Sequence, residues 1–148
     1  MSAYFIIKNL HSGFRYIVFL LLVIAIIKAI SSWLGNKPFT EGDKKLNLFT
    51  LISAHTQLLI GLVLYFISPV VQFNANTMKD PLTRYFTVEH WVMMLIAIVL
   101  ITIGYSKSKR GTTDTGKHKT VSIFYTTAFL VILIAIFAGH LPLIGSFQ

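Results

Sequence analysis

Four long apolar stretches, separated by short polar segments, run through the 148 residues of the chain. They cover about residues 12–34, 46–70, 86–107 and 119–141. An α-helix needs about 20 apolar residues to cross a hydrocarbon layer of roughly 30 Å. The pattern therefore predicts four transmembrane helices. Because short connections favour antiparallel neighbours, we expect an all-α, integral membrane, up-down-up-down four-helix bundle that forms a single domain, residues 1–148.

Proline and glycine mark the ends of these stretches. Pro38 cannot continue the first helix, and Gly35 suits the left-handed conformation that often follows a helix end. Pro69 lies near the end of the second stretch, and Pro142 follows the fourth. The breaks support the division into four helices.

Composition narrows the class of protein. The chain is 55% hydrophobic and 12% charged, whereas soluble domains are about 25% charged. This excludes a domain that is surrounded by water on all sides, and also a disordered chain. The chain has no cysteine, which excludes covalently attached heme, thiolate-held iron–sulfur clusters and a cysteine nucleophile.

The net charge is +8 at pH 7, and the basic residues are unevenly placed. Eight basic residues lie in or beside the first and third connections: Lys37, Lys44, Lys45, Lys107, Lys109, Arg110, Lys117 and Lys119. Four lie at the opposite ends of the stretches: Lys8, Arg15, Lys79 and Arg84. The positive-inside rule puts the richer side in the cytoplasm and both termini outside. Lysines beside apolar spans indicate anionic membrane lipid as the partner, and no nucleic acid.

Histidines are the candidate functional residues, because ionisable groups within a span usually mark a site. His11, His90 and His140 come from three predicted helices and lie at a similar depth, near the outer face. His55 lies in the inner half of the second helix, and His118 lies at the cytoplasmic start of the fourth.

Two imidazoles that face each other inside an apolar bundle are the ligand set of a non-covalent heme b. The first and third helices are diagonal in an up-down bundle, so we expect His11 and His90 to form the pair, with His140 as an alternative ligand. Arg15 is one turn after His11, and Arg84 just precedes the third helix. Both arginines are candidate partners of the heme propionates.

A second heme would require His55 and His118. By residue count His118 lies roughly 10 Å nearer the cytoplasm, so the spacing favours one heme over two. Each histidine also has a simpler interpretation. His55 could form a hydrogen bond between helices alongside Gln57, His118 could belong to a solvated basic loop, and a histidine at a helix end could be an interfacial polar residue.

Three segments, residues 10–16, 55–66 and 88–94, resemble the small bacterial four-helix membrane proteins known as cytochrome b. Residues 57–61 are also similar to heme A synthase, and the diagonal histidines are similar to those of diheme transmembrane cytochromes b. The resemblance implies iron ligands at His11, His55, His90 and His118, with one heme toward each face, and a place in the bacterial inner membrane, where the termini that the positive-inside rule puts outside are periplasmic.

These features together predict an electron-transfer protein. Bis-histidine ligation leaves no open iron position, so we expect no catalytic residue and an oxidoreductase subunit or redox partner rather than an autonomous enzyme. Its expected partners are a quinone and other respiratory subunits. Two alternatives stay open: a cofactor-free structural or assembly subunit of a membrane complex, and a small transporter that uses His55 and Gln57.

Overall fold

The structure is a computed structural model that describes residues 2–138, and within this range every regular element is helical. Six helical segments follow one another: α1 Ala3–Leu34, α2 Glu41–Ile67, α3 Pro81–Arg84, the π-helix η1 Tyr85–Glu89, α4 His90–Lys109 and α5 Asp114–Ala138. The segments α3, η1 and α4 are contiguous and form one span. The described chain thus has four helices that are long and apolar enough to cross a membrane.

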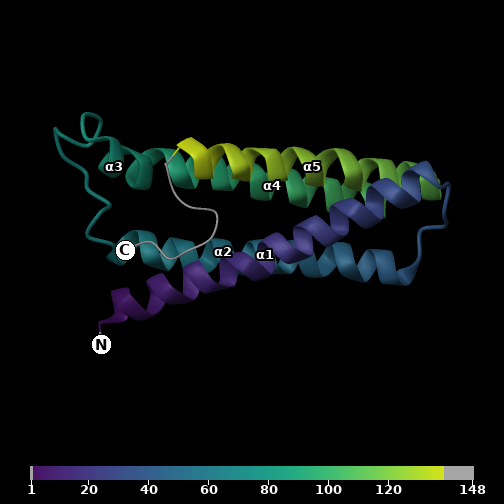
Figure 1. Cartoon of the computed structure of the whole chain (residues 1–148), viewed down its shortest axis with the longest axis horizontal. Helices are drawn as coiled ribbons and strands as arrows, with labels where there is room; N and C mark the ends of the chain where they lie inside the picture. The colour runs from purple at the N-terminus through teal and green to yellow at the C-terminus, as the bar shows by residue number, and fades with distance from the viewer. Residues whose placement is uncertain (1, 139–148) are drawn as a thin grey trace.

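Consecutive long helices run in opposite directions, with α4 and α5 side by side and α1 crossing the molecule obliquely (Figure 1). Helix α1 packs against α2 and α5, and α4 packs against the same two helices. The connections 35–40 and 110–113 lie together at one end of the molecule, which we call the lysine end. The start of α1 and the segment 81–90 lie at the other, the histidine end.

Two helices begin earlier than the apolar pattern predicts, because polar residues cap them. Helix α1 begins at Ala3 rather than near residue 12, since the Ser2 hydroxyl accepts a hydrogen bond from the Phe5 N–H at 3.2 Å. Helix α2 begins at Glu41 rather than near 46. There Thr40 and Asp43 form a capping box, in which each side chain accepts the other residue's backbone N–H.

The helix ends also refine the expectations. Helix α1 ends at Leu34 as predicted, but Gly35 has a φ of −89° and the left-handed residue is Asn36, with a φ of 49°. Asparagine tolerates this conformation better than other residues with side chains. Helix α2 ends at Ile67, three residues early, because the proline that follows Ser68 disfavours helical backbone at that position.

The third span covers residues 81–109 rather than 86–107. Asp80 caps it, with its carboxylate accepting hydrogen bonds from the hydroxyl and the N–H of Thr83, and these bonds hold the pKa of Asp80 below its usual value. The fourth span begins at Asp114 rather than near 119. Its predicted end at 141, together with His140 and Pro142, lies outside the described residues.

Alanines from all four spans lie at the centre of the packed helices and allow close approach there. The buried core consists of Leu22, Ala25, Ala29, Ala54, Ala97, Ile101, Val121, Tyr125 and Ala128. The outer surface is apolar as well: Leu20, Phe66 and Phe137 are 62%, 77% and 72% exposed. Such a surface suits hydrocarbon rather than water.

Candidate functional site

The structure brings together the two histidines that the sequence pairs. His11 on α1 and His90 at the start of α4 lie next to each other at the histidine end, in a T-shaped arrangement with ring centroids 6.3 Å apart and ring planes at 89°. Both side chains are half-buried. The two residues are 79 positions apart in the chain, so the contact depends on how the helices pack and not on local sequence.

A π-helix places His90 beside Tyr85. Residues five apart in an α-helix point about 140° away from each other, at 3.6 residues per turn. In η1 the His90 N–H donates to the Tyr85 carbonyl, and this wider turn brings the two side chains to one side, with ring centroids 5.6 Å apart. The Thr87 carbonyl in the same turn accepts hydrogen bonds from the Tyr65 hydroxyl at 2.7 Å and from Nε1 of Trp91 at 2.8 Å.

The hydrogen bonds of Tyr85 determine which ring nitrogen of His90 carries its proton. The buried Tyr85 hydroxyl donates its single proton to the Ala135 carbonyl at 2.8 Å. It can therefore only accept from Nδ1 of His90, at 3.3 Å. This network assigns the proton of His90 to Nδ1 and leaves Nε2 as the nitrogen with a lone pair. Histidines that bind metals are commonly oriented in this way.

His11 lies against a glycine of α2. A Cβ atom added to Gly61 would lie 3.1 Å from Cε1 of His11, so a larger residue at this position would displace the imidazole. Nε2 of Gln57 donates to the His11 carbonyl at 2.8 Å and ties the two helices together at this level. Nδ1 of His11 is buried and has no hydrogen-bond partner within the described chain. An unpartnered buried nitrogen is what a site for an additional group would present.

The two predicted arginines lie near this pair but have different contacts. The Arg15 guanidinium lies 5.1 Å from the centre of the Tyr16 ring and donates to its hydroxyl at 3.3 Å. Arg84 forms an ion pair with Glu89 at 2.9 Å and donates to the Met78 carbonyl. Arg84 is thus engaged by a carboxylate, and Arg15 by the side chain of Tyr16.

His55 and His118 have separate partners. His55 is exposed at the surface of α2, and its Nε2 lies 3.0 Å from the Thr102 hydroxyl of α4. That hydroxyl donates to the Ile98 carbonyl, so His55 is the donor to Thr102. The interpretation of His55 as a hydrogen-bonding residue between helices is confirmed, and Gln57 has the same role toward α1.

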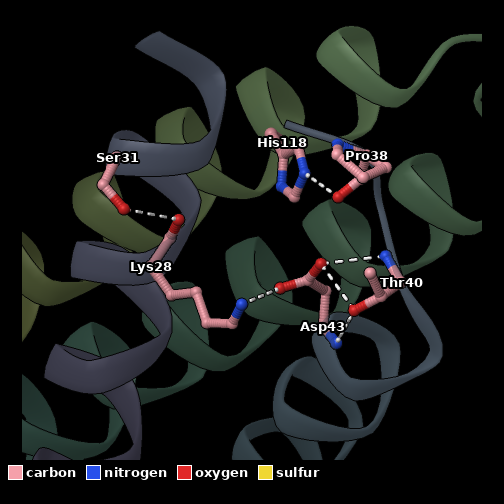
Figure 2. A network of polar contacts seen from close by, with 6 residues as sticks. All are labelled: Lys28, Ser31, Pro38, Thr40, Asp43 and His118. Atoms are coloured by element: carbon pink, nitrogen blue, oxygen red, sulfur yellow. Dashed lines mark hydrogen bonds and ion pairs between the residues drawn. The ribbon is translucent and has the colours of Figure 1, made fainter. Parts of the chain in front are cut away.

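The interpretation of His118 as part of a solvated basic loop is wrong. Its side chain is 1% exposed, its Nε2 donates to the Pro38 carbonyl at 3.2 Å, and its ring lies 5.1 Å from that of Phe39. Figure 2 shows this bond next to the ion pair of Lys28 with Asp43, at 2.8 Å. The connection 35–40 folds back over the start of α5, which a pattern of apolar and basic residues does not reveal.

Sequence reasoning missed two residues of the site, Tyr85 and Gly61. Tyr85 is five residues before His90, a spacing that an α-helix would not bring together. Gly61 did leave a signal, since a glycine inside an apolar helix often marks a close approach.

The described residues hold no cluster of three or more histidine, cysteine or acidic side chains that could bind a metal ion unaided. A porphyrin supplies four nitrogen ligands of its own, so a heme would need only two donors from the protein. Comparison of the chain with protein families, with characterised proteins and with solved structures finds no match.

Proposed function

We propose that this protein is a membrane b-type cytochrome that transfers single electrons, and that His11 and His90 would hold its non-covalent heme b. The proposal includes an up-down-up-down four-helix bundle across a bacterial inner membrane, with the histidine end and the termini on the periplasmic side. Membrane lipid surrounds the bundle, and a quinone or another respiratory subunit exchanges electrons with it. Nucleic acid has no part in this function.

The observation that carries the proposal is the separation of the two imidazoles. Imidazole nitrogens bind metal ions at about 2.0–2.1 Å, and each nitrogen lies about 1.1 Å from the centre of a ring whose bonds are near 1.3 Å. Two imidazoles on opposite sides of one ion therefore have ring centres about 6 Å apart. The observed 6.3 Å agrees with this distance.

The surrounding residues of the chain fit the same role. Tyr85 keeps the proton of His90 on Nδ1 and leaves the lone pair of Nε2 available to the iron of a heme. Gly61 makes room for the ring of His11, and Gln57 fixes the backbone from which that ring projects. Arg15, one turn further along α1, supplies positive charge near the same end. When bound, heme b supplies a one-electron Fe(III)/Fe(II) couple.

The second heme, held by His55 and His118, stays a prediction that rests on the resemblance. In the structure the Nε2 atoms of both residues donate to protein oxygens, Thr102 Oγ1 and the Pro38 carbonyl. Binding iron through Nε2 would break both bonds. We therefore propose one heme per chain at the histidine end.

A pyridine hemochrome assay on the purified protein tests the proposal. We expect one heme b per chain, and a loss of most of it in His11→Ala and in His90→Ala. His55→Ala is the matched control, since it removes an imidazole from the same bundle but should keep the heme. Full heme content in both His11→Ala and His90→Ala would exclude these ligands.

The rival function is a cofactor-free structural or assembly subunit. The hydrogen bonds of His55 and His118 favour it, because both histidines join separate segments of the fold. A stable, colourless protein, purified from cells with ample heme, would support this function and refute the cytochrome.

A further inference from the structure

A cavity of about 130 Å³ lies at the lysine end, far from the paired histidines along the helices. The start of α2, the end of α4 and the first turn of α5 surround it. Its charged and aromatic lining consists of Phe39, Glu41, Lys44, Tyr105, Lys109 and Lys117. Three lysines against one glutamate give this small space a formal charge of +2.

The three lysines are available to a ligand. The two ion pairs within residues 2–138 are Lys28 with Asp43 and Arg84 with Glu89, and neither involves these lysines. Lys44 and Lys117 are half-buried at the cavity, and Nζ of Lys117 lies 5.3 Å from the centre of the Phe39 ring. The positive charge is thus partly held in place instead of spread over flexible, solvated side chains.

The location indicates what kind of anion would fit. The cavity lies where three apolar helices end, which is the depth of phospholipid headgroups beside a span. Helices α2 and α5 both begin there. Exposed apolar side chains such as Phe49 and Ile103 lie further along α2 and α4, toward the membrane interior.

We propose that this cavity binds the phosphate group of an anionic phospholipid through Lys44, Lys109 and Lys117. Basic pockets between transmembrane helices are suited to such headgroups. The inference is independent of the heme, because none of its residues contacts His11 or His90. A lipid held at this point would join α2, α4 and α5 at the end where the two short connections lie.

Native mass spectrometry of the detergent-purified protein, with phosphatidylglycerol and phosphatidylcholine as probes, tests the proposal. We expect one phosphatidylglycerol per chain to be retained in preference to phosphatidylcholine. Replacing Lys44, Lys109 and Lys117 together by glutamine should weaken that retention at least about tenfold. Retention by this variant equal to that of the wild type would overturn the proposal.

The matched control replaces three exposed lysines of the same end, Lys37, Lys45 and Lys119, by glutamine. It makes the same change in net charge but leaves the cavity intact, so we expect wild-type retention. An equal loss in both variants would show diffuse attraction and no site. Inorganic phosphate is the second probe: if it binds as tightly as phosphatidylglycerol and displaces it, the occupant is a soluble phosphate and the lipid assignment is wrong. Matching circular dichroism spectra establish that both variants fold.

Discussion

Replacing Tyr85 by phenylalanine tests the effect of the orientation of His90 apart from the effect of packing at the histidine end. The substitution keeps the ring and removes the hydroxyl. Two buried groups then lose a partner, the Ala135 carbonyl and the Nδ1–H of His90. Leaving a buried polar group unsatisfied costs about 1–3 kcal/mol, so we expect the free energy of unfolding to fall by an amount in this range.

The effect on heme follows from the tautomer. Without the acceptor, the proton of His90 is no longer held on Nδ1, and the imidazole becomes a weaker electron donor through Nε2. Loss of such a supporting bond typically lowers metal affinity about 10- to 100-fold. We expect Tyr85→Phe to release heme faster to excess apomyoglobin and to have a higher reduction potential, since a weaker donor stabilises Fe(III) less.

Tyr65→Phe is the matched control for this experiment. It also removes a hydrogen bond from a tyrosine to a backbone carbonyl, that of Thr87, at 2.7 Å. It should destabilise the fold by about 1 kcal/mol without changing the heme potential. Wild-type heme release and potential in Tyr85→Phe would refute the reasoning, as would equal changes in the two variants.

Two further predictions concern the fold. In Gly104→Ala the new Cβ would lie 2.5 Å from Cβ of Phe124, so α4 and α5 must separate, and denaturation in detergent should show a free energy of unfolding lower by about 1–3 kcal/mol. Gly13→Ala is the control, because its new Cβ would have no atom within 4 Å and should leave the stability unchanged. A Gly104→Ala variant as stable as the wild type would contradict the close packing. The pKa of Asp80 is held low by bonds from Thr83, so its stabilising effect is present above pH 3.8, the usual pKa, and disappears as the pH falls through the lowered value. Thermal unfolding at successive pH values should show this loss in the wild type and not in Asp80→Asn, and parallel profiles would disprove it.

The apolar pattern predicted the four spans because a helix that crosses hydrocarbon must be long and unbroken, and each such helix requires a continuous run of apolar residues in the sequence. It did not predict where they begin. Ser2 and the pair Thr40 and Asp43 cap α1 and α2 ahead of the predicted starts, since an N-cap side-chain oxygen satisfies N–H groups of the first turn.

The pairing of His11 with His90 was predictable from their depth and from the diagonal placement of their helices. Counting residues places His11 and His90 near the same face, and the structure brings their rings together. The partners of the histidines depend on geometry that residue counts do not contain. The π-turn that turns Tyr85 toward His90 and the chain reversal that buries His118 under Pro38 are the two examples.

Electron paramagnetic resonance of the oxidised, purified protein at low temperature tests the central claim most directly. Two histidine ligands make ferric heme low-spin, and the anisotropy of its spectrum reports the angle between the imidazole planes. With planes at 89°, we predict a single, highly anisotropic low-spin signal that disappears in His90→Ala. A high-spin signal, or a colourless protein with no heme signal at all, would contradict a heme held between His11 and His90.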